Sequence, residues 1–352
     1  MKGRIIVRVY NKDIKLRKEQ FIVPTIFFVL SIIGIMGAGV SLGFIKNELY
    51  NRFIASGIMV LALLIPIYAG MGLNFSISIG AISAQAASIL VIGAKVSGIL
   101  GLISIFILTT IICLILGNII GFILNRAKGK EMITSIIIGL LGTSLYQLVF
   151  MVGYGSVVHP RNKEIILSNG IGVRNMVDLM EFKILMNRFS VMPILIIVLC
   201  AAFVKYITGT KFGCKLKAVG QGVEVANMLG IDGDKVRRYA IVISTVMAGI
   251  GHLLFMLNMG NINVYTGHLN IDIFACAALL AGGATLTKAS ISNAFIGIIL
   301  FHTLFIVSPL AGQNLFQNVA LGEYFRSFIA YGVIAIAFVI NLRNERKIHK
   351  TE

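Results

Sequence analysis

The sequence predicts an all-α membrane protein, a bundle of about ten transmembrane helices with both ends in the cytoplasm. Hydrophobic residues make up 57% of the 352 residues and charged residues only 13%, so most of the surface cannot face water. Apolar runs of roughly 20 residues, the length at which one helix crosses a bilayer, recur along most of the chain. Lys and Arg gather in short tracts between those runs.

Ten apolar segments are expected to be the spanning helices. They cover residues 21–44, 53–71, 76–94, 97–124, 132–154, 190–207, 239–257, 272–286, 291–310 and 328–342. The first run is too long for the apolar core of a signal peptide and no cleavage site follows it promptly, so we expect a retained helix. Residues 21–342 would form one transmembrane domain between a basic segment, 1–20, and a tail, 343–352.

The distribution of basic residues predicts the orientation. Most of the Lys and Arg lie in the segments 1–20, 125–131, 208–238, 288–290 and 343–352. The positive-inside rule places these segments in the cytoplasm. The formal net charge of +17 is therefore explained by topology, rather than by nucleic-acid binding. The connection 155–189 carries mixed charges and is expected outside, with a short helix near 176–185.

Two spans are expected to be interrupted at membrane depth. The segment 70–81 crowds Gly, Asn and Ser together, and the segment 280–285 repeats the pattern in the second half of the chain. Backbone that leaves a helix inside a bilayer must be buried in protein or line a cavity. Similar breaks in both halves favour an internal repeat of about five helices. For Gly282 and Gly283, close helix packing is an equally good explanation.

The few polar side chains at membrane depth mark a candidate path for a solute. The densest group is Asn74, Ser76, Ser78, Ser83 and Gln85. A neutral lining of this kind suits an uncharged hydroxyl-bearing or zwitterionic solute better than an ion.

Three further polar residues have two interpretations. Asp272 is either solvated at the outer end of the eighth span or part of the translocation path. Tyr146 and Gln147 can donate into the path, although hydrogen bonds between packed helices explain them better.

The sequence contains no motif for energy conversion or catalysis. It lacks a G-x-x-x-x-G-K-[ST] phosphate loop, an H-E-x-x-H pair and a G-x-S-x-G element. The membrane-centred charges of a proton-coupled exchanger are also missing. His252 and His302 are lone membrane histidines expected to pack between helices, whereas His268 is expected outside without a special role. The four cysteines lack metal-ligand spacing, so no metal site is predicted.

The connection 208–238 has the most ordered pattern of the inside loops. Its residues Glu224 to Leu229 predict one short helix, bounded by Gly222 and Gly230, with the acidic residue in the first turn. Held parallel to the membrane, such a helix could insert into a groove on the surface of another protein.

This loop resembles that of the permease subunits of bacterial ATP-binding-cassette importers, specifically the branched-chain amino acid, ribose and nucleoside permease family. The residues that match the family pattern in register are Gly213, Leu216, Ala218, Gly220, Ala226, Gly230 and Ile231. The run 272–284 is similar to the family's polar entry, alanines and double glycine. The run 72–80 looks like the sugar branch's G-x-D-L-S-x-G, with Asn74 in place of the usual Asp and a different spacing of the last glycine. The resemblance covers nearly the whole chain.

The resemblance implies a permease of the type II importer kind that binds no cofactor and catalyses no reaction itself. It would pair with an identical or different second permease, bind two cytoplasmic ATPase subunits that hold ATP and Mg²⁺, and accept solute from an extracytoplasmic binding protein. The implied coupling residues are Gly220, Glu224, Ala226, Gly230, Ile231 and Asp232. The candidate path residues are Asn74, Ser76, Ser78, Gln85, Gln147, Asp272, Gly282 and Gly283.

Two functional hypotheses follow. The first is the importer permease of the bacterial cytoplasmic membrane, with a sugar or nucleoside favoured over a branched-chain amino acid because the Ser-rich third span looks more like that branch. The second is an energy-independent channel or facilitator for a small neutral solute, since the chain has no energy-handling residue of its own. A membrane enzyme is disfavoured because no catalytic cluster is present.

Overall fold

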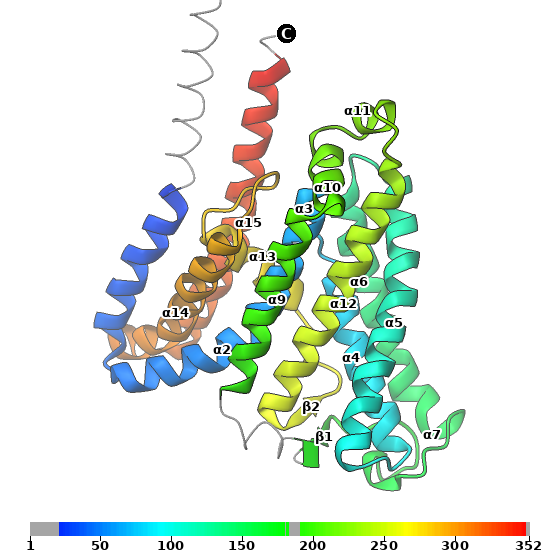
Figure 1. The fold of residues 1–352 in the computed structure, drawn as a ribbon. Helices are drawn as coiled ribbons and strands as arrows, with labels where there is room; N and C mark the ends of the chain where they lie inside the picture. The colour runs from blue at the N-terminus through cyan, green and yellow to red at the C-terminus, as the bar shows by residue number, and fades with distance from the viewer. Residues whose placement is uncertain (1–20, 180, 183–190, 350–352) are drawn as a thin grey trace, which may run out of the picture. The chain divides into compact units, whose positions relative to one another are not determined.

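The computed structural model describes residues 21–179, 181–182 and 191–349, and most of them are helical (Figure 1). The longer elements are Phe21–Ala38, α2 (Leu42–Ala62), α3 (Leu64–Tyr68), α4 (Ile77–Gly93), α5 (Gly98–Arg126), α6 (Glu131–Leu148), α9 (Met192–Gly209), α10 (Lys211–Gln221), α11 (Val223–Met228), α12 (Gly233–Met259), α13 (Ile271–Ala281), α14 (Ile291–Phe316) and α15 (Val319–His349). The shorter ones are η1 (Val149–Gly153), α7 (Tyr154–Ser156), η2 (Lys163–Ile165), β1 (Met176–Asp178) and β2 (Asn261–Asn263). The predicted basic segment 1–20 and residues 350–352 of the predicted tail lie outside the described residues.

Seven helical segments in the described part of the chain are long and apolar enough to cross a membrane. They are Phe21–Ala38, Leu42–Tyr68, Gly98–Arg126, Glu131–Ser156, Met192–Gly209, Gly233–Met259 and Ile291–Phe316. The shorter apolar helices α4 and α13 each adjoin one of the predicted interruptions, which limits their length. The predicted helical membrane fold is confirmed, and each of the ten predicted segments overlaps a helix.

The junction between the first two helices differs from the prediction. The first helix ends at Ala38, because Gly39 adopts a left-handed φ of +62°, and α2 then begins at Leu42 rather than at residue 53. The polar stretch before residue 53 was expected to be a connection between helices. It is helical instead, with an ion pair one turn apart between Glu48 and Arg52 at 3.1 Å.

The chain forms two compact units. Unit 1 comprises the described parts of Met1–Phe53 and Cys276–Glu352, and unit 2 comprises those of Ile54–Ala275. In unit 1, the helix Phe21–Ala38 lies along α14, with the Gly37 position against Leu315. Such small residues let membrane helices approach closely, where burial of apolar surface supplies little driving force.

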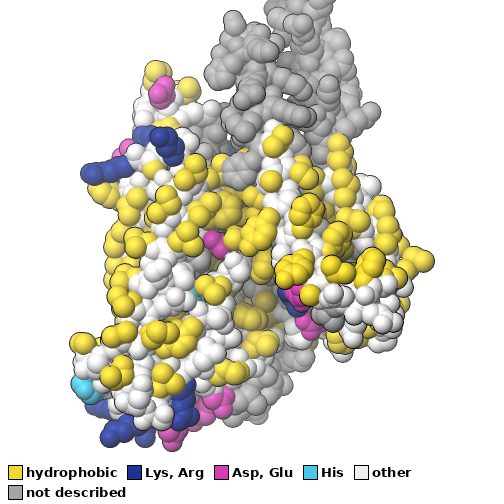
Figure 2. Space-filling model, turned by 180° about the vertical axis from the view of Figure 1, so that it is seen from behind, with side chains coloured by type: hydrophobic (Ala, Val, Ile, Leu, Met, Phe, Trp, Pro, Cys, Tyr) yellow, Lys and Arg dark blue, Asp and Glu magenta, His cyan; other side chains and the backbone are white. Residues whose placement is uncertain are grey.

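In unit 2, α4 is buried on nearly all sides and contacts α5, α6 and α12. Small residues bring these helices together: a Cβ on Gly80 would lie 2.6 Å from the Thr245 carbonyl, and one on Gly249 would lie 2.6 Å from Cys113 Sγ. The outer faces of α5, α6 and α9 expose large apolar side chains, as expected for helices that face lipid. Figure 2 shows hydrophobic side chains over the middle of this unit and Lys and Arg toward its ends.

A two-stranded ladder replaces part of the helix predicted near 176–185. β1 pairs antiparallel with β2, and Val177 opposite Ile262 is buried with it. The left-handed Gly260 ends α12 and turns the chain into β2, which gives β1 its partner. Because that partner lies far away in the sequence, local pattern could not reveal the strand. Residues 181–182 are helical, and 180 and 183–185 of the predicted helix lie outside the described residues.

Candidate functional site

The predicted interruption before α4 is present at residues 69–76, which are not helical. Gly70 and Gly72 have left-handed φ values of +73° and +68°, which favour glycine and stop the helix. The side-chain oxygen of Asn74 then accepts hydrogen bonds from the Ser76 backbone N–H at 3.1 Å and from the Ser76 hydroxyl at 2.6 Å. Asn74 and Ser76 are buried, so this break is held by protein groups, as the sequence pattern predicts.

The helix α6 supports the break from one side. The backbone N–H of Phe75 donates to the Ser135 hydroxyl at 3.1 Å, and a Cβ on Gly72 would lie 3.2 Å from the sulfur of Met132. A movement of the first two turns of α6 would therefore displace the interrupted segment directly.

Polar groups occur at two levels along the interface of α4 with α6. At the first level, a Cβ on Gly139 would lie 2.8 Å from the Ser78 hydroxyl and 3.9 Å from a carboxylate oxygen of Asp272. The second level holds Gln85 on α4 and Tyr146 on α6, each two helical turns, or about 10 Å, farther along its helix. We call this row the polar seam; it consists of Ser78, Gln85, Gly139, Tyr146, His268 and Asp272.

The second level of the polar seam is completed by the connection between β2 and α13. Gln85 donates its Nε2–H to the Asn263 carbonyl at 3.1 Å, and its Oε1 lies 2.8 Å from His268 Nδ1. The His268 ring meets the Tyr146 ring edge to face, with centroids 5.0 Å apart. The connection therefore lies against both helices of the seam.

Gln147 on α6 and Tyr265 within the connection also fix the position of this segment. Gln147 donates its Nε2–H to the Tyr265 carbonyl at 3.0 Å. The Tyr265 hydroxyl donates toward two carbonyls, Val173 at 2.7 Å and Phe150 at 3.2 Å. Gln147 thus fixes the backbone that carries His268.

Six of the eight predicted path residues lie in unit 2, at the break, at the polar seam or, for Gln147, next to the seam. They are Asn74, Ser76, Ser78, Gln85, Gln147 and Asp272. Asp272 is partly buried at the start of α13 and faces Ser78 through Gly139, rather than standing free in solvent. The arrangement is that of a narrow, mostly neutral row of hydrogen-bonding groups.

The other two predicted path residues, Gly282 and Gly283, belong to unit 1. A Cβ on Gly282 would collide with the Asn293 carbonyl, while the Asn293 amide donates to the Gly282 carbonyl at 2.7 Å. Gly283 has a φ of +85°, which ends α13. These contacts favour the alternative explanation, in which the pair permits a turn and close packing onto α14.

His268 was expected to be external without a special role, but it is buried in the polar seam. Its side chain is 1% exposed and it touches both helices of the polar seam. It lies in a connection without periodicity, so no local signal reports its burial. Among the described residues, no group of three or more His, Cys, Asp or Glu is placed to hold a metal ion.

The predicted short helix of the 208–238 connection is present as α11. Gly222 precedes it and the left-handed Gly230 ends it, with the Ile231 N–H bonded to the Ala226 carbonyl at 3.0 Å, as in a Schellman motif. The helix α10 before it was not predicted, because its Lys-rich run reads as a solvated loop. Thr210 caps α10 by accepting the Gly213 N–H.

Large apolar side chains stand exposed on and just after α11. Val225, Met228 and Leu229 are 61%, 86% and 72% exposed, while Ala226 faces inward and is buried. Glu224 lies in the first turn, where a negative charge suits the helix dipole.

The last turn of α10 rests on the α3 end of the interruption. A Cβ on Gly220 would collide with the Tyr68 carbonyl, and a Cβ on Gly70 would lie 2.9 Å from Gly220 Cα. The two backbones are therefore in direct contact, and Figure 1 shows α10 beside α3.

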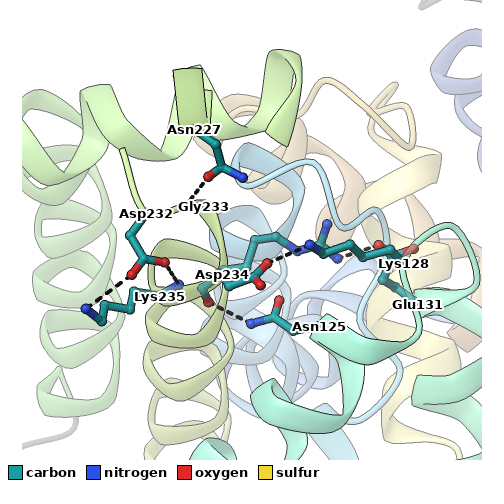
Figure 3. Close-up of polar contacts among 9 residues, drawn as sticks. Asn125, Lys128, Glu131, Asn227, Asp232, Gly233, Asp234 and Lys235 are labelled. Atoms are coloured by element: carbon teal, nitrogen blue, oxygen red, sulfur yellow. Dashed lines mark hydrogen bonds and ion pairs between the residues drawn. The ribbon is translucent and has the colours of Figure 1, made fainter. Parts of the chain in front are cut away.

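A second contact joins this end of the molecule to α6 through charged groups (Figure 3). Arg237 on α12 pairs with Glu131, the first residue of α6, and the two side chains are only 4% and 13% exposed. Lys128 pairs with Asp234 at 2.8 Å. We call this group the charged cluster; it consists of Asn125, Lys128, Glu131, Asn227, Asp232, Gly233, Asp234, Lys235 and Arg237.

The start of α12 is tied to α11 within the charged cluster. The Asn227 side-chain oxygen accepts the Gly233 N–H at 2.9 Å. Asp232 caps α12 by accepting the Lys235 N–H at 3.0 Å, and this hydrogen bond lowers the pKa of the Asp232 carboxyl. A push on α11 would thus reach α12 and, through Arg237, the start of α6.

A family model described as "Branched-chain amino acid transport system / permease component" matches residues 44–338. No solved structure matches the chain.

Curated relatives match a shorter part of the chain. The Autoinducer 2 import system permease protein LsrC of Yersinia enterocolitica is 28% identical over 166 residues, which is 46% of this chain and 45% of that protein. The protein of the same name from Yersinia pestis is 26% identical over 166 residues, 46% of each chain. The chain thus spans about half the length of the curated relatives it matches.

Proposed function

Because the chain belongs to the permease-component family of branched-chain amino acid transport systems, we propose that it forms the membrane path of an ATP-binding-cassette importer. One observation carries this proposal: the α10–α11 segment contacts the interruption directly and is linked to α6 through the start of α12. It touches the interruption through Gly220, and it reaches α6 through Gly233 and the Arg237–Glu131 pair. A force applied to α11 would therefore act on the polar seam, as coupled transport requires.

The surface for a partner ATPase would be α11 with its exposed apolar residues. Glu224 lies in its first turn, and the left-handed Gly230 ends it with the Ile231 N–H bonded to the carbonyl of the buried Ala226. Asp232 caps the following helix α12. Gly220 would transmit its movement to the interruption. ATP and Mg²⁺ would be bound by two such ATPase subunits.

The solute would be small, polar and uncharged, with a sugar or nucleoside favoured over a branched-chain amino acid. The polar seam offers hydroxyl, amide and imidazole groups, with one carboxylate at its first level. The relatives from Yersinia are named for the import of autoinducer 2, which leaves the solute of this chain to experiment.

The remaining parts of the assembly follow from this function. Residues 21–342 would act as one permease domain in a bacterial cytoplasmic membrane, with both termini and the α10–α11 segment on the cytoplasmic side. A second permease would complete the path. An extracytoplasmic binding protein would dock at the opposite end, near β1 and the 155–189 connection.

The proposal is tested by charging the exposed tip of α11. Met228→Asp places a carboxylate on a residue that is 86% exposed, so the fold should be kept while the apolar contact with the ATPase is lost. The full chain would be co-expressed with its ATPase, and both co-purification and ATP-driven uptake in proteoliposomes measured. We expect both to fall by about tenfold or more, as for loss of a central interface contact.

Val157→Asp is the matched control, because Val157 is 79% exposed at the other end of unit 2. It should leave ATPase co-purification unchanged. Full ATPase binding and uptake by the Met228 variant would contradict the proposed docking surface. Uptake that stops at equal concentrations with ATP present would instead identify an energy-independent facilitator.

A further inference from the structure

The amide of Gln85 fixes the tautomer of His268. Its Nε2–H donates to the Asn263 carbonyl at 3.1 Å, so its oxygen is the atom that lies 2.8 Å from His268 Nδ1. An amide oxygen only accepts, and Nδ1 must therefore carry the proton. Burial lowers the pKa of His268 to about 4, so the ring is neutral at neutral pH and Nε2 presents a bare lone pair.

Two polar atoms at this level of the polar seam have no hydrogen-bond partner among the described residues. They are the Tyr146 hydroxyl oxygen and His268 Nε2. Both side chains are almost fully buried, at 4% and 1% exposure, and their rings are in edge-to-face contact. Such atoms are rare in native proteins, because they lose water without gaining another partner. Two of them on touching rings indicate a partner that the described chain does not supply.

We propose that Tyr146 and His268 form a subsite for one hydroxyl group of an uncharged, polyhydroxylated solute. The solute hydroxyl donates to the Nε2 lone pair and accepts from the Tyr146 hydroxyl, which satisfies both atoms at once. A carboxylate has no proton for Nε2, so the subsite disfavours the carboxylate end of an amino acid. This inference rests on the proposed function, because a solute reaches the buried pair only when the α4–α6 interface opens.

The surroundings of the pair fit a neutral ligand and a fixed geometry. The seam carboxylate, Asp272, lies at the other level, two helical turns away along α6. Gly267 lets the connection carrying His268 lie tightly against α4, since a Cβ there would come within 2.8 Å of Gln85 Nε2. Fixed neutral donors and acceptors of this kind orient ligands in sites that are otherwise apolar.

The decisive variant is Tyr146→Phe, which removes one hydroxyl that has no hydrogen-bond partner among the described residues. Its matched control is Tyr265→Phe, the same chemical change at a nearby hydroxyl that donates to the backbone carbonyls of Val173 and Phe150. His268→Phe removes the acceptor and also the bond to Gln85, so it serves as a second, more disruptive variant. Each full chain would be reconstituted with its ATPase and binding protein, and ATP-driven uptake of tritiated D-ribose, uridine and L-leucine measured.

We expect Tyr146→Phe to lower uptake of D-ribose or uridine by about tenfold, as for a site built to bind a substrate hydroxyl, with an unchanged unfolding midpoint. Tyr265→Phe should lower the unfolding midpoint and keep the preference among the three solutes.

Three outcomes would overturn the subsite. The first is undiminished uptake of hydroxylated solutes by Tyr146→Phe, which would leave buried water as the only partner of the two atoms. The second is a wild-type chain that takes up L-leucine but neither D-ribose nor uridine. The third is wild-type chain that drives no ATP-dependent uptake, which would overturn the proposed function as well. In the first two cases the proposed function stands.

Discussion

The polar seam and the charged cluster both include residues of α6, but their hydrogen bonding differs. In the charged cluster at the start of α6, the acids Glu131, Asp232 and Asp234 each face a basic partner. In the polar seam, two turns beyond Gly139, the neutral Tyr146 hydroxyl and His268 Nε2 face no partner among the described residues. The charged side chains of the charged cluster, around the start of α6, are all paired, whereas Tyr146 and His268 near its other end each keep a polar atom without a partner among the described residues.

This difference separates two tasks along one helix. A buried ion pair tolerates little displacement, because either charge left alone in a poorly solvated site is costly. The charged cluster is therefore suited to holding α6, α11 and α12 in register. Unpaired neutral groups cost less and can exchange partners, which suits contact with a passing solute. Variants that act on one group and spare the other test this division.

The largest effect is expected at the buried ion pair. Arg237→Met leaves the Glu131 carboxylate without its partner in a site where Arg237 is 4% and Glu131 13% exposed. We expect a loss of about 3 kcal/mol or more in the free energy of unfolding, measured by denaturation in detergent micelles. The double variant Arg237→Met with Glu131→Gln removes both charges and should recover most of the loss. Equal instability of the single and double variants would show that the pair does not act through charge.

The next effect is expected where α10 meets the interruption. Gly220→Ala forces a methyl group against the Tyr68 carbonyl and should cost about 1–3 kcal/mol, as other overpacked contacts do. Uptake should fall further than stability, because the same contact links α10 to the path. Gly209→Ala is the control, since a Cβ there meets nothing within 4 Å. Equal unfolding midpoints for Gly220→Ala and Gly209→Ala would contradict the tight contact between α10 and the interruption, and with it this coupling route.

A smaller effect separates the two tyrosines near the seam. Tyr265→Phe should lower the free energy of unfolding by about 1 kcal/mol, because its hydroxyl donates to the Val173 carbonyl. Tyr146→Phe should change it by close to zero, since no described residue accepts from or donates to that hydroxyl. Thermal unfolding of the solute-free chain measures both. A clear loss in the Tyr146 variant would mean that the seam is closed by an internal bond.

The parts of the fold that follow local pattern could be predicted from the sequence. Apolar runs located the helices, and the Gly-Asn-Ser sequence at 70–81 located the interruption, because both signals are contained in a few adjacent residues. The position of Gly222 and Gly230 likewise bounded α11. The helical character of the polar stretch before residue 53 was missed, because an ion pair one turn apart looks like a solvated loop in composition.

The candidate site could be predicted only in part, because its members come from distant segments. The glutamines at 85 and 147 were found by their depth in apolar runs, whereas His268 lies in an aperiodic connection. Its burial depends on β1–β2 pairing and on the reach of Gln85 across 183 residues of sequence. The Arg237–Glu131 pair was missed for the same reason, since basic residues beside a membrane span also serve topology.

The smallest effect is expected at Asp232, the residue of the charged cluster that caps the start of α12. Asp232 accepts the Lys235 N–H at 3.0 Å, and this bond lowers the pKa of its carboxyl, so the ionised cap is favoured in the folded chain. A carboxyl with a lowered folded pKa adds stability above its unfolded pKa, and this contribution disappears as the pH falls through the folded value. Asp232→Ala should therefore lower the unfolding midpoint slightly at pH 7, and the difference from wild type should shrink below about pH 4. Asp232→Asn keeps an oxygen for the cap, so its unfolding midpoint at pH 7 should lie between those of wild type and Asp232→Ala. A difference that persists unchanged in acid would show that the cap acts without its charge.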